Sequence, residues 1–172
     1  MPNLPTVRVL RRYVILLIIN CLVMTEPCPS VLRRLALRRL GMDVGRMWIK
    51  SQTMFRGVKV FIGDGTSISH GCYFGSGPIA IGERCDISAG VRFMSIDHDA
   101  GGPERRAGRV RQRQITVGDG TWIGASVTVL GGVDIAEGCV IASGAVVTDD
   151  TEPHGLYAGV PAVRKRDLPV TA

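Results

Sequence analysis

The feature that most constrains this chain of 172 residues is an apolar residue that recurs at every sixth position. In the C-terminal half this residue is always β-branched, and a Gly, Ser or Asp follows it three residues later. The same period runs through the preceding part of the chain, with one extra residue inserted. The repeat positions are Ile62, Ile68, Phe74, Ile81, Ile87 and Phe93, and then Val117, Ile123, Val129, Ile135, Ile141 and Val147.

Six residues are too few for a helix with this pattern, but they suffice for one short strand and one turn. Three such units close a coil, and coils stacked at the strand spacing of about 4.8 Å pair their backbones. The repeat residues then fill a narrow central stack, while the glycines, 22 in all, turn the corners. The sequence therefore predicts an all-β protein, a parallel β-solenoid.

The five cysteines of the chain form no CxxC pair, so neither a disulfide framework nor a zinc site is indicated. Cys72, Cys85 and Cys139 each lie two residues before a repeat position. We interpret these three as small core residues, and we expect no metal.

A break in the repeat marks an insertion. Val117 follows Phe93 by 24 residues, which is four periods, so a looped-out segment leaves the three faces in register. We assign residues 98–114 to this inserted loop, which is polar and rich in Arg. Long loops that leave a regular scaffold are usually functional, and His98 stands where this one leaves the coil.

The basic charge belongs to the N-terminal segment. Residues 1–46 hold eight Arg and two acids, whereas the rest of the chain is balanced, and we see no interleaved aromatics of a nucleic-acid binder. The apolar run 13–24 is shorter than the roughly 20 residues that span a bilayer. It predicts a helix that packs on the domain or on a neighbouring subunit, or one that lies in a membrane interface. A second helix is expected over 30–41, with Ser30 as N-cap and Gly41 after its end.

Two motifs give the sequence a resemblance to a known family. They are residues 115–125, Ile-Thr-Val-Gly-Asp-Gly-Thr-Trp-Ile-Gly-Ala, and residues 158–162, Ala-Gly-Val-Pro-Ala. With the repeat and the spacing from His98 to Trp122, they resemble the hexapeptide-repeat acyltransferases, most closely the maltose and galactoside O-acetyltransferases and related enzymes of polysaccharide biosynthesis. The resemblance extends over residues 44–166. It implies a left-handed parallel β-helix, a handedness that the repeat alone does not determine.

The resemblance implies an O-acetyltransferase that moves an acetyl group from acetyl-CoA to a hydroxyl of a sugar or polysaccharide precursor. A hydroxyl needs a base whose pKa lies near the working pH, so we assign His98 as general base. The family binds its co-substrate between the subunits of a homotrimer, and the amide of Ala125 is the implied oxyanion donor. The implied acetyl-CoA residues are Trp122, Gly124, Ala125, Ser143 and Thr148, with Arg164, Lys165 and Arg166 for the phosphates, and the implied acceptor residues are Ser69 and His70.

The sequence departs from the family at four positions. Ser69 and Ser76 replace an Asn and an acid of the acceptor site, while Asp149 and Val163 replace a Lys and an Arg on the CoA side. The acceptor therefore stays open. The alternatives are an acetyltransferase for an amino sugar, an amino acid or another small molecule, and a non-catalytic trimeric scaffold.

We accordingly divide the chain into three parts. Residues 1–43 form an apolar and basic helical segment, residues 44–163 the β-helix, and residues 164–172 a basic tail. We expect a cytoplasmic protein whose N-terminal segment contacts the inner face of the membrane, because that segment combines apolar residues with arginines.

Overall fold

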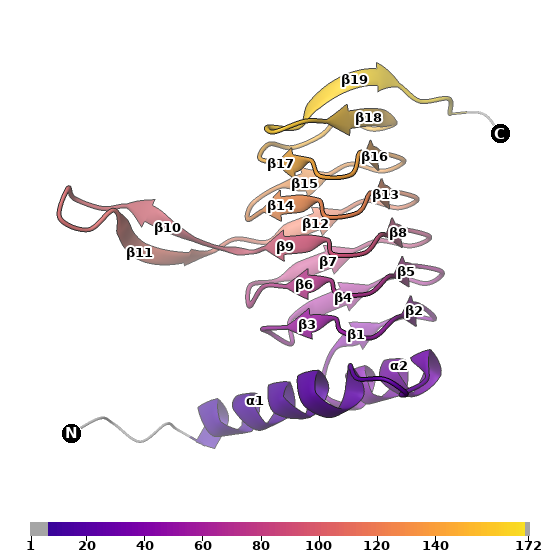
Figure 1. Cartoon of the computed structure of the whole chain (residues 1–172), viewed down its shortest axis with the longest axis vertical. Helices are drawn as coiled ribbons and strands as arrows, with labels where there is room; N and C mark the ends of the chain where they lie inside the picture. The colour runs from indigo at the N-terminus through magenta and orange to yellow at the C-terminus, as the bar shows by residue number, and fades with distance from the viewer. Residues whose placement is uncertain (1–6, 171–172) are drawn as a thin grey trace.

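A computed structural model of the chain describes residues 7–170, except for the side chain of Arg8. Its body is a parallel solenoid with three faces (Figure 1). The first face contains β1 (Asp43–Val44), β4 (Val60–Ile62), β7 (Ile79–Ile81), β12 (Ile115–Val117) and β15 (Asp134–Ile135). The second contains β2 (Trp48–Ile49), β5 (Ser67–Ile68), β8 (Asp86–Ile87), β13 (Trp122–Ile123), β16 (Val140–Ile141), β18 (Gly155–Ala158) and β19 (Val163–Asp167). The third contains β3 (Met54–Phe55), β6 (Tyr73–Phe74), β9 (Arg92–Met94), β14 (Thr128–Leu130) and β17 (Val146–Val147). The predicted hexapeptide-repeat solenoid is thus confirmed.

The predicted repeat residues form the core, and each of the twelve is at most 2% exposed. On the third face Phe55, Phe74 and Phe93 lie on successive coils. Their ring centroids are 4.7 and 5.0 Å apart, close to the strand spacing. Because every coil places its repeat residue over that of the coil below, apolar contact and backbone pairing extend together along the axis.

The position two residues before the repeat takes a small side chain that bonds to the next coil. Cys72, Cys85 and Cys139 are buried, and their thiols donate to carbonyl oxygens at 3.2 to 3.3 Å. Burial raises the pKa of Cys72 to about 11, so the thiol stays protonated at neutral pH. Thr66 and Thr121 donate in the same way from equivalent positions. These cysteines are core residues, as the sequence predicted.

The insertion is an ordered antiparallel hairpin of β10 (Ile96–Ala100) and β11 (Ala107–Gln112), where the sequence predicted only a loop. It leaves the corner between the third and first faces, here called the hairpin corner, and projects from the solenoid (Figure 1). The coils on either side remain in register, because Phe93 pairs with Val129 and Ile81 pairs with Val117.

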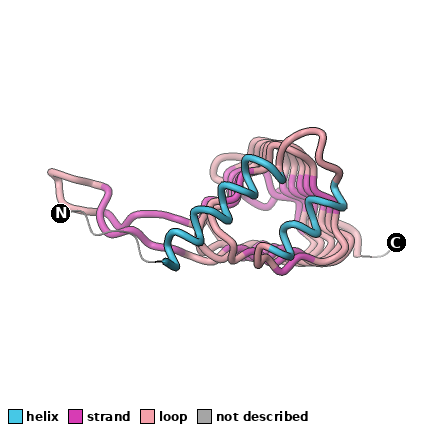
Figure 2. Tube along the Cα trace, turned by 90° about the horizontal axis from the view of Figure 1, so that it is seen from below, coloured by secondary structure: helices cyan, strands magenta, loops and turns pink. Residues whose placement is uncertain are grey.

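Helices α1 (Val7–Ile18) and α2 (Ser30–Arg39), with the π-helical turn η1 (Ile19–Val23) between them, lie across the first coil (Figure 2). The side-chain amide of Asn20 exchanges two hydrogen bonds of 2.8 Å with the backbone of Phe55. The guanidinium of Arg33 is buried and donates to the carbonyls of Val23, Thr25 and Ile49. The helical segment therefore packs on its own domain and closes the end of the core.

The ends of α2 test two expectations from the sequence. Gly41 has φ +100° and follows the helix as predicted; its N–H and that of Met42 donate to the carbonyls of Arg38 and Leu37. The prediction of Ser30 as N-cap is wrong, because Ser30 is the first helical residue and its hydroxyl accepts a hydrogen bond from the Ile49 amide. Within the part of the chain that the structure describes, no helix is long and apolar enough to cross a bilayer.

Candidate active site

The hairpin fixes the position of His98. Residue 98 of β10 pairs with Val110 of β11, but the register then shifts, so that Ala100 pairs with Ala107. Gly108 and Arg109 thus lie opposite the single residue Asp99, which makes a β-bulge on β11. Bulges are common beside active sites, where they redirect a group from the regular strand direction.

The bulge supplies the hydrogen-bond partner of the imidazole. His98 Nδ1 lies 3.0 Å from the carbonyl oxygen of Gly108. Because a carbonyl can only accept, Nδ1 carries a proton, so in the neutral imidazole it is Nε2 that keeps the unshared electron pair. A neutral imidazole held in this tautomer can accept a proton at Nε2, which is what a general base requires.

The two acids that flank His98 in the sequence have other partners. Asp97 accepts a 2.7 Å hydrogen bond from the backbone N–H of His98. Asp99 forms an ion pair with Arg111 across the hairpin, and this hydrogen bond lowers the pKa of the Asp99 carboxyl. The imidazole is therefore oriented by a backbone carbonyl and not by either of the flanking acids.

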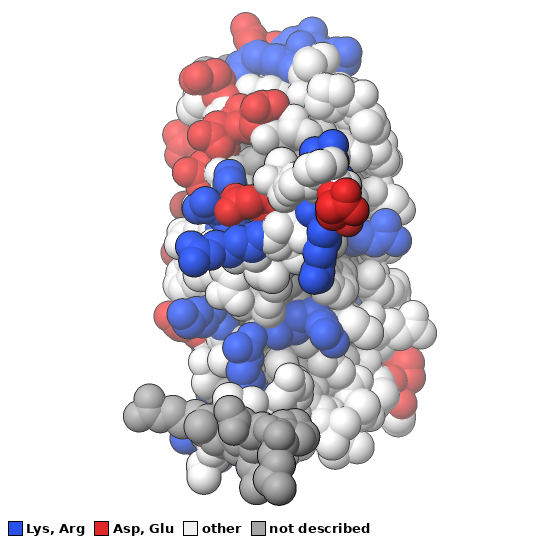
Figure 3. Space-filling model, turned by 90° about the vertical axis from the view of Figure 1, so that its left-hand side faces the viewer, with Lys and Arg blue, Asp and Glu red and all other residues white. Residues whose placement is uncertain are grey.

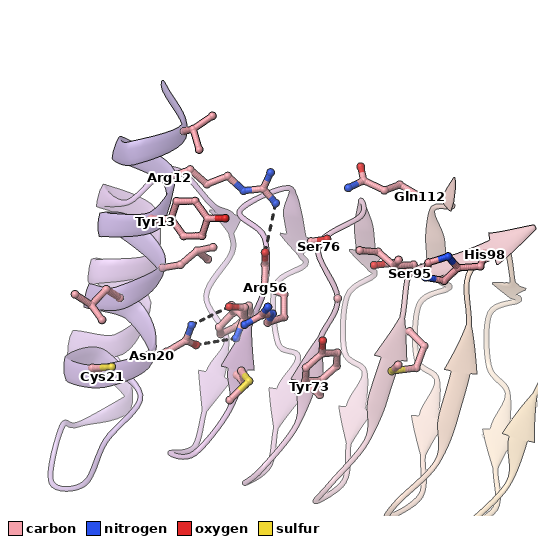
Figure 4. Close-up of a pocket in the computed structure, with 18 residues that line it drawn as sticks. Arg12, Tyr13, Asn20, Cys21, Arg56, Tyr73, Ser76, Ser95, His98 and Gln112 are labelled. Atoms are coloured by element: carbon pink, nitrogen blue, oxygen red, sulfur yellow. Dashed lines mark hydrogen bonds between the residues drawn. The ribbon is translucent and has the colours of Figure 1, made fainter. Parts of the chain in front are cut away.

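His98 opens into a groove of about 800 Å³ between the hairpin and helix α1. The third face forms its floor, and Figure 4 shows Arg12 and Tyr13 of α1 reaching toward the strands while His98 stands at the far end. Ser76, which replaces an acid of the family's acceptor site, also lines this groove. The volume is that of an ordinary small-molecule site.

A second cluster lies at the corner between the second and third faces, here called the Trp122 corner. A cleft of about 370 Å³ contains Ser69 and the indole of Trp122. The indole is 54% exposed and its Nε1–H donates to the hydroxyl of Ser88 at 3.2 Å. His70 is the exposed turn residue that follows Ser69, and its backbone carbonyl accepts hydrogen bonds from the Gly90 amide and the Cys72 thiol. The structure thus brings both predicted acceptor residues to the corner of Trp122.

Small residues continue this corner toward the C-terminal end. Gly124 packs so closely on the next coil that a Cβ would lie 2.6 Å from the amide nitrogen of Ser143. The amide of Ala125 donates to Ser143 Oγ at 3.1 Å. The predicted oxyanion donor is therefore occupied by a hydroxyl within the chain, whereas the Ser143 amide donates to no acceptor among the described residues.

Of the three predicted phosphate-binding cations, Arg164 has another role. Its guanidinium donates to the Tyr157 hydroxyl, the Asp167 carboxylate and the carbonyls of Glu152 and Pro153, and it lies over the Tyr157 ring. These hydrogen bonds, first the one with Tyr157, raise the pKa of Arg164. The assignment of Arg164 to a phosphate is therefore not supported by its contacts. Lys165 and Arg166 are exposed on β19 at the end of the second face.

One chain does not bring all the predicted residues together. His98 and Thr148 lie at the hairpin corner, while Ser69, His70, Trp122, Gly124, Ala125 and Ser143 lie at the Trp122 corner. The third face separates the two corners, since the chain crosses it in the five steps from Ala125 to Leu130, at most about 17 Å of extended chain. Within residues 7–170 no group of three His, Cys, Asp or Glu side chains is placed to hold a metal ion.

Comparison with known proteins agrees with this architecture. Residues 114–149 match the family described as bacterial transferase hexapeptide (six repeats). A hexapeptide-repeat acetyltransferase from Vibrio cholerae, solved with acetyl coenzyme A, aligns with a TM-score of 0.80 and 26% identity over 95% of this chain and 91% of that one. A galactoside acetyltransferase in complex with coenzyme A aligns with a TM-score of 0.81 and 25% identity, over 93% and 80% of the two chains.

A relative from Staphylococcus aureus (strain MRSA252), whose name is that of an acetyltransferase without a stated acceptor, is 39% identical over 114 residues. The match covers 64% of this chain, which spans 57% of the length of that relative. The predicted resemblance to the hexapeptide-repeat acyltransferases is confirmed, and residues 114–149 carry the repeat that defines this family.

Sequence reasoning did not find Gly108, the bulge or the groove beside α1. A single glycine in a polar loop carries no signal of its own, and the register shift becomes visible only once the hairpin is paired. A Cβ on Gly108 would lie 2.8 Å from the carbonyl oxygen of Asp99, so the glycine is required by the close approach of the two strands.

We predict that Gly108→Ala displaces the bulge and releases the imidazole from the carbonyl. The ring ¹⁵N shifts of His98 should then move from those of the Nδ1–H tautomer toward a mixture of both tautomers. Gly102→Ala, in the same hairpin but with open space around the added methyl, should leave the shifts unchanged. Equal spectra for wild type and Gly108→Ala would show that the bulge does not orient His98.

Proposed function

We propose that the protein is an acetyl-CoA-dependent O-acetyltransferase that acts on a hydroxyl of a sugar or polysaccharide precursor, with His98 as general base. The carrying observation is the imidazole itself, whose proton is held on Nδ1 by a backbone carbonyl and whose Nε2 is left basic at the end of a groove. The resemblance to acetyltransferases solved with coenzyme A or acetyl coenzyme A supports the choice of donor.

The proposed reaction is one direct transfer. Nε2 of His98 removes the proton of the acceptor hydroxyl while its oxygen attacks the thioester carbonyl carbon. The carbon–sulfur bond then breaks, and the imidazolium returns the proton to the departing thiolate. The products are the acetyl ester and free CoA, and the developing oxyanion needs a backbone N–H, for which the Ser143 amide is available.

The Trp122 corner suits the pantetheine arm of acetyl-CoA. Its side chains are small along successive coils, with Gly124, Ala125 and Ser143 beside the exposed indole. From β13 to β19 the second face advances by three strand spacings, about 14 Å. Lys165 and Arg166 at that end provide cations for the phosphates.

Because His98 and the Trp122 corner lie at different corners of one chain, we infer that a homotrimer joins them. In a closed ring the hairpin corner of each subunit faces another corner of its neighbour, so every site receives His98 from one subunit and Trp122 from the next.

We predict that His98→Ala reduces acceptor-dependent release of CoA thiol by about 10²- to 10⁴-fold, the usual contribution of a general base. Binding of acetyl-CoA, measured by calorimetry, should be retained. His154→Ala is the matched control, since His154 lies beside Glu137 and outside both clusters. If His98→Ala retained a tenth of the activity or more, His98 would not be the base.

We also predict that two inactive variants complement each other. His98→Ala lacks the base, and Ala125→Phe blocks the corner for the pantetheine arm. Mixed trimers contain one intact site, so equal co-expression should restore about a quarter of wild-type activity by random assembly. Separately purified variants, mixed without exchange of subunits, serve as the control. Absence of recovery in demonstrated mixed trimers would place the whole site in one chain.

Two other readings give different results in the thiol assay. An N-acetyltransferase would use the same base but prefer amino sugars or amino acids as acceptors. A trimeric scaffold would neither bind acetyl-CoA nor depend on His98. The ordered Nδ1 hydrogen bond favours catalysis, because a scaffold has no need to hold an exposed imidazole in one tautomer.

We further propose that the helical segment lies against an anionic membrane surface. The outward face of α1 carries Leu10 and Val14, 56% and 48% exposed, and that of α2 carries Leu32 and Leu35 among exposed arginines. Both helices lie on the same end of the solenoid (Figure 2). An apolar face with cations at its edge matches an interfacial helix.

We predict that wild-type protein floats with vesicles containing phosphatidylglycerol, and less so with neutral vesicles or in high salt. Leu10→Gln with Val14→Gln should abolish flotation, because it removes the apolar contact without touching the groove. Val110→Gln, which changes a residue 57% exposed on the hairpin, should have no effect. Flotation that survives the double substitution, or that never occurs, overturns the membrane contact.

A further inference from the structure

The groove that begins at His98 changes character along its length. The end near His98 carries the polar side chains of Ser76 and Gln112 beside the apolar side chains of Met94 and Ile96. Ser95 is fully buried and its hydroxyl accepts a hydrogen bond from the Gly77 amide at 2.9 Å, which makes this end rigid. Small hydroxyl and amide groups at a catalytic base suit the hydroxyls of a sugar ring.

The opposite end is apolar. Tyr13, Leu16 and Leu17 of α1 face Met54 and Phe55 of the third face across the groove. Tyr13, Leu17 and Met54 are 67%, 62% and 47% exposed in the single chain, so no other part of the same chain covers this wall. Contact with a hydrocarbon chain would remove that apolar surface from water.

Two cations stand between these ends. Arg12 and Arg56 line the groove, and Arg12 Nη2 donates to the carbonyl of Arg56 at 3.4 Å. Neither guanidinium forms an ion pair with any residue that the structure describes. The lining contains no Asp or Glu, and on the face toward which the hairpin projects the acidic side chains gather mainly near the C-terminal end (Figure 3). Guanidinium groups without carboxylates favour a phosphate.

The groove is too long for one sugar. From β9, where the hairpin leaves, to β3, which packs on the helices, the floor spans two strand spacings, or about 10 Å, and α1 lies beyond. Figure 4 shows this order, from His98 past Ser95 and Ser76 to Arg12 and Tyr13. A free monosaccharide at His98 would leave the cations and the apolar wall without contacts.

We propose that the acceptor is an amphiphile, a sugar joined through a phosphate to a hydrocarbon chain. Its sugar hydroxyl lies at His98, its phosphate at Arg12 and Arg56, and its chain along Tyr13, Leu17 and Met54. The proposal rests on the acetyltransferase function and names its substrate class. Charge complementarity and the polar-to-apolar order of the lining select this occupant. The hydrocarbon chain of the acceptor leaves the groove along α1, the helix that is proposed to lie against lipid.

The first test compares three forms of the same sugars as acceptors in the thiol-release assay. Glucose, galactose and N-acetylglucosamine are supplied free, as n-octyl glycosides and as n-decyl glycosyl phosphates, below their micelle concentrations. For the accepted sugar, kcat/KM should rise from the free form to the octyl form and be highest for the decyl phosphate, at least about tenfold above the free sugar. Equal values for the three forms would overturn the inference.

Paired variants locate the effect in the groove. Leu17→Gln should remove most of the preference for alkyl acceptors, whereas Leu32→Gln, at similar exposure on α2, should retain it. Arg12→Gln should remove the advantage of the phosphate over the octyl glycoside, and the adjacent exposed Arg11→Gln should retain it. If Leu17→Gln still prefers alkyl acceptors over the free sugar, the hydrocarbon chain of the acceptor binds elsewhere.

Calorimetry with n-decyl phosphate alone separates the two hypotheses, because it requires no turnover. If n-decyl phosphate binds and both Leu17→Gln and Arg12→Gln weaken that binding, the amphiphile site is supported even when no sugar is acetylated. The absence of acetylation would then overturn the acetyltransferase assignment and not the proposed site. Acetylation of free sugars without binding of decyl phosphate would retain the enzyme and overturn the proposed acceptor class.

Discussion

Register between successive coils is the constraint on which the rest of this structure depends. Each coil pairs its backbone with the next and sets its repeat residue over the one below, as the stacked rings of Phe55, Phe74 and Phe93 show. A change of one residue in a strand would turn the apolar side chain outward. The insertion is tolerated because it leaves and rejoins the scaffold at one corner with the pairing of Phe93 and Val129 intact. The residues of the hairpin can therefore change without a change in the register of the core.

The solenoid is readable from the sequence because its repeat is local. A single buried position in six, with a turn residue at fixed distance, predicts the strand, the corner and the stack, and places Cys72 in the core. The helical segment is predictable as helix, but its placement is not. Its residues are apolar on both sides: Ile19 is buried against the first coil, while Leu10 and Leu17 face solvent. Only the packed structure distinguishes the two sides.

The site is predictable in its residue types and not in its arrangement. His98 could be singled out from its place at the insertion, yet its partner is a carbonyl, and a carbonyl leaves no mark on the sequence. The position of Gly108 follows from a register shift across the hairpin, and the hydroxyl of Ser143 occupies the Ala125 amide from the next coil. In the sequence, Arg164 is one of three neighbouring cations. In the structure, its contacts with Tyr157 and Asp167 give it a structural role. Each of these differences arises from a tertiary contact.

The separation of the two corners has a consequence for how such a site changes its acceptor. The Trp122 corner is built from the repeat itself, so the close packing of Gly124 on Ser143 ties it to the core. The groove, by contrast, is bounded by α1 and the hairpin, two elements outside the repeat that contact the solenoid at its edges. Substitutions at Arg12, Tyr13 or Leu17 alter this boundary without disturbing coil register. A scaffold of this kind can hold one site constant while its added elements vary, and under the proposed function the apolar, cationic helix α1 would select the acceptor by charge and hydrocarbon contact.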